Sequence, residues 1–508
     1  MSTGTPIGRG LLPRRLVIPM AQQAGPAAVP VVEVGQRVRK GELIGRPGGP
    51  RSAEAHASSH PNGGTDRTHL RSAGVHASTS GAVSAIREGP APTVNGLTIS
   101  LCVHLETDGL DDPAPPGVWP GERDARIDAI CNAGIVGLGG AVFSTAEKLR
   151  GDSDCELLIL NGAECEPYIS CDDMLMREHP LEVVRGALAM MDLAGAESTV
   201  FAVERDKPDA LRAVREAAAQ IGDTRIEFAR VPTVYPAGGE RQLVEVLTGR
   251  EVPSGGYPPA AGCICQNVGT AFALDRFIRR GERLTSRVVT VTGSGVANAA
   301  NVEVPIGTPI RDLIEFCGGY QGEVARLILG GNMMGYALPG DDVPITKAGN
   351  CVVAAHSDEV RESNGEWPCI RCGDCAEVCP PRLLPQELLR ASAVRDFDQL
   401  DALGLNDCIE CGCCDVACPS QIALTERFRR AKQAWAVALR RAATAELADK
   451  RHRRKLARVA AQTEDVGRRQ DDLIAAIGSE DGRAVIEAAV ARASKRRGES
   501  ETTQKPAP

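Results

Sequence analysis

The chain has 508 residues, with 58 Lys and Arg against 66 Asp and Glu, so its formal net charge is −8. A hydrophobic content of 43% can fill several buried cores, whereas the negative charge and the 3% aromatic content argue against a nucleic-acid binder. The N-terminus lacks an apolar signal region and no run reaches membrane-spanning length, so we expect a cytosolic, multidomain α/β chain. In that reducing compartment, the cysteines are expected to stay as thiolates that are available to metal rather than to form disulfides.

Residues 1–105 are predicted to form a barrel-sandwich-like β domain. Short β-rich runs alternate with Gly and Pro, and VPVVEVGQRVRKGELIG and GVHASTSGAVSAI resemble the two halves of a lipoyl- or biotinyl-type barrel. No MKM-like tripeptide occurs, so a docking barrel is expected in place of a cofactor carrier. The Gly-, Pro- and Ser-rich stretch 46–72 is predicted to be a flexible insertion, and its irregularly spaced His56, His60 and His69 are interpreted as solvated imidazoles.

Residues 120–282 alternate apolar strands with Ala-rich helices. The strands are CELLILN, STVFAVE and RIEFARVP, and the helices are expected over 180–193 and 209–221. This alternation predicts a Rossmann-like α/β domain with a parallel or mixed sheet. A strand-rich segment over 286–305 and a helix over 310–317 then predict a β-grasp module over 285–345.

The last third is predicted to comprise an α-helical double-cluster domain over 355–432 and a basic, helical, partly disordered tail over 433–508. Residues 426–458 contain 12 Lys and Arg against 3 Asp and Glu. Such a helix could contact anionic lipid headgroups, at about 1 kcal/mol per basic residue, or a partner subunit, or simply solvent.

Nine of the cysteines lie between Cys369 and Cys418, in two runs of the form CxxCxxCxxxCP. This is the bacterial ferredoxin spacing, in which the fourth cysteine of each run completes the other cluster. The first [4Fe–4S] cluster is therefore assigned to Cys369, Cys372, Cys375 and Cys418, and the second to Cys379, Cys408, Cys411 and Cys414. Zinc would favour separated CxxC pairs. Cys413 breaks the spacing and is interpreted as a non-ligand, and the remaining nine cysteines are interpreted as small buried side chains.

A glycine-rich loop at 134–141 stands before the helical STAEKLR. Glycines allow the backbone to approach a phosphate, although a tight turn would use them equally well. The loop gains weight from polar groups that follow apolar strands, in NGAECEP, YPAGGE and NVGT, because ligands bind at the carboxyl ends of strands in α/β folds.

The series GIVGLGGAVFSTAEKL, LILNGAECEPYISCDDMLMREHP, VYPAGGERQLVEVLTGREVPSGG, QNVGT and GGNMMG resembles the C subunit of the Rnf electron-transport complex. The middle of the chain is also similar to the flavin- and NADH-binding subunit of respiratory complex I. The resemblance covers about residues 12–425 and implies FMN, NADH as substrate, an SLBB-like β-grasp module and two [4Fe–4S] clusters. It implies no catalytic acid or base, because the cofactor itself carries the hydride.

The resemblance also implies which residues form the cofactor sites, because positions of this sequence match the family's binding motifs one by one. The FMN-phosphate loop and its basic partner match Gly137, Gly139, Gly140 and Lys148, and contacts to the flavin match Asn161 and Glu164. Glu166 matches an acid that contacts the nicotinamide nucleotide, and later parts of the pocket match Gly239, Glu240, Asn267 and Thr270. The family usually reads GGAGFPT where this chain has GGAVFST, so Val142 and Ser144 depart from it, and a β-branched residue tolerates less backbone freedom than Gly.

The implied function is a peripheral subunit at the cytoplasmic face of the bacterial inner membrane. It would pass electrons between NADH and, indirectly, ferredoxin, in a complex whose integral-membrane and iron–sulfur subunits hold it and couple the reaction to ion translocation. A microcompartment cobalamin reductase shares the flavin and cluster parts. A non-catalytic iron–sulfur electron-transfer adaptor, which has lost nucleotide binding, is the alternative that Val142 and Ser144 keep open.

Overall fold

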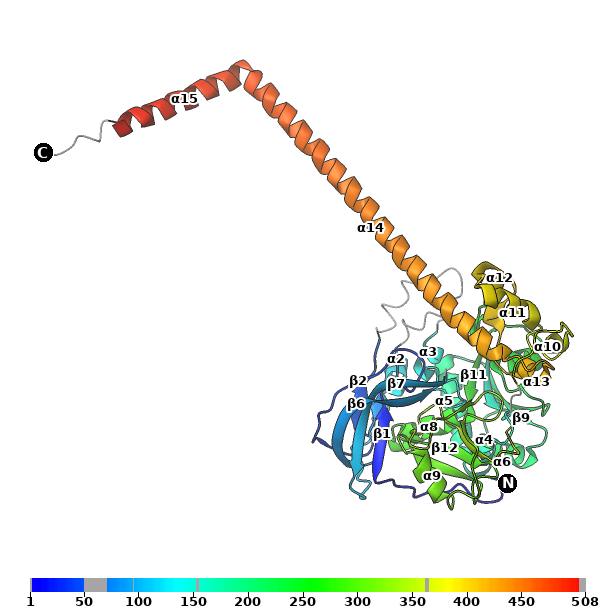
Figure 1. The fold of residues 1–508 in the computed structure, drawn as a ribbon. Helices are drawn as coiled ribbons and strands as arrows, with labels where there is room; N and C mark the ends of the chain where they lie inside the picture. Colours follow the sequence, from blue (N-terminus) through cyan, green and yellow to red (C-terminus); the bar gives the residue numbers. More distant parts are fainter. Residues whose placement is uncertain (1, 50–70, 95, 152–154, 361–364, 502–508) are drawn as a thin grey trace. The chain divides into compact units, whose positions relative to one another are not determined.

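The computed structural model describes residues 2–49, 71–94, 96–151, 155–360 and 365–501 (Figure 1). The N-terminal domain is built of two small antiparallel sheets, as expected for a barrel-sandwich arrangement. One has the order β1-β7-β6-β3 and the other β2-β4-β5. The strands are β1 (Arg15–Pro19), β2 (Val29–Pro30), β3 (Arg37–Val38), β4 (Leu43–Arg46), β5 (Val75–His76), β6 (Gly81–Thr93) and β7 (Gly96–Thr107).

The core between these sheets consists of alternate strand residues such as Leu16, Ile18, Val103 and Leu105, which are almost fully buried. This period of two is what a half-buried strand requires. The insertion expected at 46–72, with its three histidines, falls largely on 50–70, which lie outside the described residues.

The α/β domain contains a four-stranded sheet in which all neighbours run parallel. Its strands are β8 (Leu157–Gly162), β9 (Ser198–Glu204), β10 (Ile226–Val231) and β11 (Cys263–Asn267). Its helices are α2 (Arg123–Asn132), α3 (Thr145–Arg150), α4 (Cys171–Glu178), α5 (Pro180–Ala194), α6 (Pro208–Ile221), α7 (Glu240–Thr248), the short η3 (Pro258–Ala261) and α8 (Val268–Arg280).

The strand order of this sheet is β10-β9-β8-β11, so the direction of winding reverses between β8 and β11. In parallel sheets, such a reversal opens a crevice at the carboxyl ends of the two strands, where ligands bind. The domain has its own large core, which includes Leu158, Leu160, Phe201 and Val203 from the strands. The crevice therefore lies at the ends of strands that a well-packed core holds in place.

The β-grasp module has a five-stranded sheet of order β13-β12-β16-β14-β15, covered by α9 (Ile310–Phe316). The strands are β12 (Ser286–Thr292), β13 (Ala300–Pro305), β14 (Arg326–Leu329), β15 (Tyr336–Ala337) and β16 (Cys351–Ala355). The central strand β16 lies beyond the range 285–345 expected for this module. β16 pairs parallel with β12 and is fully buried, so the sheet is incomplete without it.

The cysteine-rich domain consists of short helices that frame two cysteine loops. They are α10 (Asp374–Glu377), α11 (Pro385–Val394), α12 (Phe397–Ala402), η4 (Leu405–Asp407) and α13 (Cys413–Ala417).

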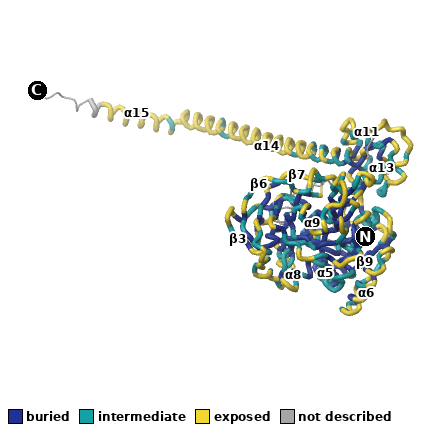
Figure 2. Tube along the Cα trace, turned by 60° about the horizontal axis from the view of Figure 1, so that its bottom comes forward, coloured by how far each residue is buried: buried dark blue, intermediate teal, exposed yellow. Residues whose placement is uncertain are grey.

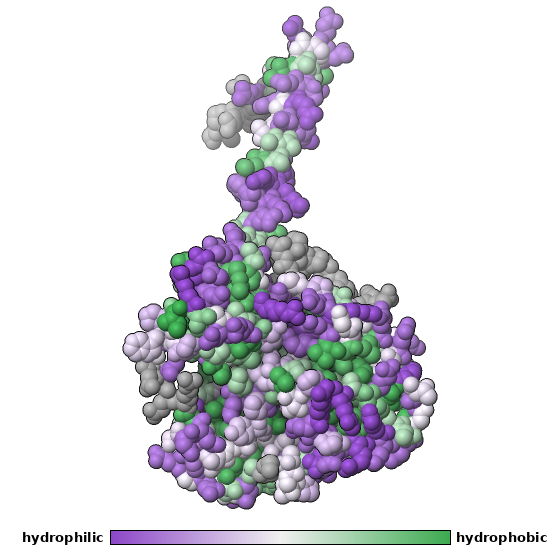
Figure 3. Space-filling model, turned by 90° about the vertical axis from the view of Figure 1, so that its right-hand side faces the viewer, coloured by the Kyte–Doolittle hydropathy of each residue, from purple (hydrophilic) through white to green (hydrophobic). Residues whose placement is uncertain are grey.

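Two long helices follow, α14 (Leu424–Gly478) and α15 (Glu480–Glu501), so the described part of the expected tail is helical apart from a bend at Ser479. The segment from Ala434 onward is a compact unit by itself. Its residues from 439 to 497 are almost all exposed (Figure 2), and its surface is mostly hydrophilic (Figure 3). Among the described residues, we find no helix that is both long and apolar enough to cross a membrane.

Candidate functional site

The glycine-rich loop is a tight, closed turn at the start of α3. The Gly137 N–H donates to the Phe143 carbonyl at 2.8 Å, and Val136 forms a bridge with Ser144. The Ser144 hydroxyl then accepts from the Glu147 N–H at 3.4 Å and caps α3. The family has Pro at this position, whereas in this chain the Ser144 side chain caps the start of the helix.

Gly139 packs closely against Asn267, whereas Gly140 leaves the outer face of this loop open. A Cβ on Gly139 would lie 3.3 Å from the Asn267 amide nitrogen. Gly140 has φ +99°, and the space where its Cβ would be built is empty to 4 Å. The backbone is thus accessible to a phosphate group, as an FMN loop requires.

Two buried side chains hold the loop from behind. The Thr270 hydroxyl accepts from the Leu138 N–H at 2.9 Å, and the Arg287 guanidinium donates to the Leu138 carbonyl at 3.0 Å. Arg287 is only 5% exposed, and burial lowers the pKa of its guanidinium. Sequence reasoning identified Thr270 but missed Arg287, because nothing near Arg287 in the chain indicates a link 149 residues away.

Val142 occupies a left-handed backbone conformation, with φ +42°, and its side chain is fully buried. This is the position at which the family usually has Gly. Its carbonyl accepts from the Ala24 N–H at 3.0 Å, which ties the loop to the barrel domain. Val142 therefore adopts the backbone conformation that Gly would adopt without strain, and this strain costs about 1–3 kcal/mol.

Lys148 and Glu240 form an ion pair beneath the crevice. Lys148 projects from α3, and its ammonium also donates to the Cys265 carbonyl at 3.0 Å. Burial lowers the pKa of Lys148, but the Glu240 carboxylate and Cys265 together outweigh that effect and raise it overall. Glu240 begins α7 directly after Gly239, the helix N-cap, so the lysine joins the glycine loop to the later part of the site.

Asn161 and Asn267 end the two strands at the reversal of the sheet and are direct partners in the β8–β11 register. The Asn161 amide donates to the Gly238 carbonyl at 2.8 Å, which places the loop before α7 over the end of β8. The Asn267 amide donates to Asp172 at 2.6 Å, and its oxygen caps α8 by accepting from the Gly269 N–H at 2.8 Å.

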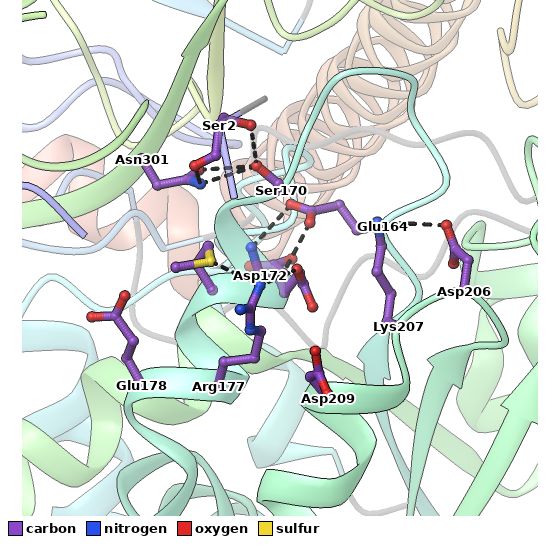
Figure 4. Close-up of polar contacts among 12 residues, drawn as sticks. Ser2, Glu164, Ser170, Asp172, Arg177, Glu178, Asp206, Lys207, Asp209 and Asn301 are labelled. Carbon is purple, nitrogen blue, oxygen red and sulfur yellow. Dashed lines mark hydrogen bonds and ion pairs between the residues drawn. The ribbon is translucent and has the colours of Figure 1, made fainter. Parts of the chain in front are cut away.

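Glu164 turns toward the start of α4, beside Asp172 (Figure 4). Its carboxylate accepts from the N–H groups of Asp172 at 3.0 Å and Asp173 at 3.3 Å. Burial, followed by repulsion from the Asp172 carboxylate, raises the pKa of Glu164. A carboxyl with a raised pKa at the mouth of a crevice can exchange a proton near neutral pH.

Glu166 contacts the β-grasp module. Its carboxylate accepts from the backbone N–H groups of Met333 at 2.5 Å and Met334 at 3.2 Å, within the loop GGNMMG. Gly331 of that loop lies so close that a Cβ would be 2.4 Å from the Glu166 Cγ. Glu166 is thus committed to an interdomain contact, and the other expected flavin-site residues meet around the crevice.

The structure brings the cysteines together in the two expected sets of four. One cavity is lined by Cys369, Cys372, Cys375 and Cys418, and another is lined by Cys379, Cys408, Cys411 and Cys414. Each cavity takes three thiols from one run and the fourth from the other. Four soft thiolates that face one common space are the ligand set of a [4Fe–4S] cube. Cys413 also lines the second cavity.

The second cysteine loop is joined to the α/β domain by contacts that sequence reasoning missed. The Tyr235 hydroxyl donates to the Cys411 carbonyl at 2.6 Å, and Arg241 donates to the Asp407 carboxylate at 2.9 Å. In contrast, Cys369 and Cys372 of the first loop are exposed.

Four family models match the chain. The RnfC barrel sandwich hybrid domain matches residues 1–62, the Nuo51 FMN-binding domain 130–276, the SLBB domain 288–337 and the 4Fe-4S dicluster domain 368–422. FMN and two [4Fe–4S] clusters are therefore the cofactors of this chain, in agreement with the loop and the cavities.

The chain is similar to proteins that are named as the C subunit of an ion-translocating oxidoreductase complex. It is 43% identical to the one from Pseudomonas aeruginosa over 437 residues, which cover 85% of this chain and 53% of that one. It is 39% identical to the one from Serratia proteamaculans over 500 residues, which cover 97% and 67%. The chain thus spans between half and two thirds of the length of these relatives.

Among solved structures, the chain is similar to an NAD⁺-reducing [NiFe]-hydrogenase in the H₂-reduced state. The match covers 55% of this chain and 54% of the hydrogenase chain, at 22% identity and a TM-score of 0.41, and a likeness this weak supports no conclusion. The sequence relatives, with the barrel, FMN, SLBB and dicluster domains in this order, decide the family. The chain belongs to the family of C subunits of ion-translocating oxidoreductase complexes.

Proposed function

We propose that this chain is the NADH-oxidising, peripheral electron-transfer subunit of a membrane-bound complex. It passes electrons between NADH and ferredoxin, and the complex couples this transfer to ion translocation. The integral-membrane and iron–sulfur subunits hold it at the cytoplasmic face of the inner membrane. The names of its relatives support the complex and the ion coupling.

The residues around the crevice have defined tasks in this proposal. Gly139 and Gly140 present backbone N–H groups to the FMN phosphate, Gly137 closes the turn beside them through its N–H bond to Phe143, and Lys148 is the nearby cation. Asn161, Glu164, Asn267 and Thr270 shape the flavin pocket, and Gly239 and Glu240 close it. FMN supplies the exchange between a hydride, which carries two electrons, and single electrons. Glu166, which binds the Met333–Met334 backbone here, would have to release that contact to meet a nucleotide.

The eight cysteines hold the two cubes in the sets that line the two cavities. One observation carries the proposal: the second cavity adjoins the α/β domain through Tyr235 and Arg241, whereas Cys369 and Cys372 at the first are exposed. This arrangement suits a chain of one-electron centres that begins at the flavin and ends at the surface.

Reconstitution tests this function directly. The chain is loaded with iron, sulfide and FMN, and NADH is added without oxygen. We expect the flavin absorbance to bleach and cluster EPR signals to appear. If flavin and clusters stay oxidised although dithionite reduces both, the assignment of NADH as donor fails and the non-catalytic adaptor is favoured.

Gly140→Val provides the matched test of the pocket, because its side chain would fill the open face of the loop. We expect this variant to lose FMN and NADH-dependent reduction while it keeps its iron. Gly222→Val is the control, since Gly222 also has a positive φ of +76° and free space, but ends α6 away from the crevice. Equal FMN content in both variants would contradict the assignment of the loop.

A further inference from the structure

We propose that Tyr235 and Asp407 are positioning residues that fix the second cysteine loop, 407–412, against the α/β domain and so set the transfer of single electrons between that domain and the second cube. The inference rests on the proposed function for the source of the electrons. It adds two residues that neither bind iron nor belong to the flavin loop. In the step that they serve, one electron moves and no bond forms or breaks.

Tyr235 holds the loop at the peptide of a cluster ligand. Its hydroxyl donates to the Cys411 carbonyl at 2.6 Å, across 176 residues of sequence. Cys411 is buried and lines the second cavity, so this hydrogen bond lies at the wall of the cube site. A phenol donor at that carbonyl fixes the orientation of the ligand and keeps water from the peptide, both of which influence a cluster.

Asp407 holds the other end of the loop, one residue before the ligand Cys408. Its carboxylate accepts from Arg241 at 2.9 Å, from the Gly255 N–H at 3.2 Å and from the Ser254 hydroxyl. Arg241 also donates to the Gly256 carbonyl at 2.9 Å, so α7 and the loop that follows it act together. The Asp407 side chain is only 16% exposed, which protects these charge-assisted bonds from solvent.

The β-grasp module supplies a third contact to the same loop. A Cβ on Gly412 would lie 3.2 Å from the Met333 carbonyl, so the two backbones pack closely. Met333 is itself held by the Glu166 carboxylate. These three contacts fix the loop at its start, at a ligand and at its end, and each comes from a group that belongs to the flavin half of the molecule or is bound to it.

In the part of the chain that the structure describes, the first cysteine loop lacks this enclosure. Cys369 and Cys372 are exposed, and so is Ile370 between them, at 68%. The two runs have the same spacing, so the difference between the loops arises from their surroundings. A rigid, enclosed loop held against the α/β domain is what a fixed tunnelling distance would require, and among the described residues the second cysteine loop has it and the first does not.

Tyr235→Phe and Asp407→Asn test the proposal in the full chain loaded with iron and FMN. Tyr235→Phe removes one hydroxyl and keeps the ring. The matched controls are Tyr320→Phe and Asp341→Asn, which remove the hydroxyl and the negative charge, respectively, from a tyrosine–aspartate hydrogen bond of 2.9 Å in the β-grasp module. Cys372→Ser, which removes a ligand of the first cube, identifies which EPR signal belongs to which cube.

We expect both test variants to keep their iron and FMN. The EPR line shape and midpoint potential of the second cube should shift, while those of the first cube stay unchanged. After photochemical reduction of FMN, reduction of the second cube should slow about fivefold in Tyr235→Phe, which corresponds to the ~1 kcal/mol of one hydrogen bond. The loss should be larger in Asp407→Asn, and neither control should change the rate.

The proposal is overturned if the signal, potential and reduction rate of the second cube match those of the unaltered chain in both variants. Equal shifts in the two controls would also overturn it, because the effect would then be general. Photochemical reduction separates it from the proposed function. If NADH reduces no form of the chain but the light-driven rates show the defect, the positioning residues stand and the assignment of NADH as donor fails.

Discussion

At the scale of single residues, Val142 shows how a fold tolerates an unfavourable side chain. The residue combines full burial with a φ of +42°, so its side chain contributes to the core while its backbone is strained. The turn survives because Ala24 binds its carbonyl and the Val136–Ser144 bridge closes the loop. The departure from the family motif therefore changes the stability of the loop more than its shape.

Val142→Gly and Val142→Ala separate these two effects. Both lose the buried methyl groups, but only Gly relieves the left-handed backbone. We expect Val142→Gly to be more stable than Val142→Ala by about 1 kcal/mol, the reverse of the usual order of Gly and Ala. Urea unfolding of the chain without cofactors measures the difference. The same pair at Val136, which is also fully buried but has no positive φ, should show the usual order.

At the scale of elements, α14 has two parts with different tasks. Its first turns belong to the cluster domain: Thr425 and Phe428 line the second cavity, and Lys432 donates to the Cys408 carbonyl at 2.6 Å. Lys432 and Arg429 also bind Glu410 at 2.9 and 3.0 Å. The segment from Ala434 onward contributes no residue to either cavity among those described.

Two truncations test this division. A chain that ends at Gln433 should retain both cubes, with about eight irons. A chain that ends at Arg427 loses Phe428 and the two basic residues at Glu410, so the second cube should be lost and the iron content should fall to about four. Iron analysis and EPR give the result. Equal iron in the two truncated chains would show that the start of α14 does not support the second cube.

At the scale of the whole molecule, Lys347 joins three domains. It lies in the β-grasp module, is 1% exposed, and donates to the Gly74 carbonyl of the barrel and to the Gly134 carbonyl of the α/β domain, both at 2.8 Å. Its own carbonyl accepts from Arg287, the residue behind the glycine loop. Burial lowers the pKa of Lys347 to about 7.

Replacing Lys347 with Met leaves the carbonyls of Gly74 and Gly134 without this donor and should lower the free energy of unfolding by about 2–3 kcal/mol. The folded pKa lies below the unfolded value, so the unfolded chain binds more protons above neutral pH and the contribution of Lys347 to stability rises with pH. The deficit of the variant should therefore grow by roughly 2 kcal/mol between about pH 7 and about pH 9.

Urea unfolding at several pH values checks this expectation. Lys40→Met is the control, because it removes a lysine whose ion pair with Asp111, at 2.7 Å, lies on the surface of the barrel. That variant should lose at most about 1 kcal/mol. A constant deficit for Lys347→Met across the pH range would contradict the neutral state of the buried amine.

The sequence alone predicted the features that depend on residues close together in the chain. The CxxCxxCxxxCP spacing predicted the two cysteine sets that line the cavities, and alternating apolar runs predicted the α/β domain. The sequence did not predict residues whose role depends on contacts between domains. Arg287 reaches over 149 residues, Tyr235 over 176 and Lys347 over 273, and no pattern near these residues indicates their partners. The strand β16 was also missed, because it follows a long irregular segment.

The crossed cysteine sets have a consequence for synthesis of the protein. The first cavity needs Cys418, and the second combines Cys379 with Cys408, Cys411 and Cys414. On a translating ribosome, neither set of four is complete until Cys414 has left the exit tunnel, when the barrel, α/β and β-grasp domains have already been made. The machinery that delivers iron therefore meets a chain whose flavin half can fold first, and whose first cube is the last to be closed.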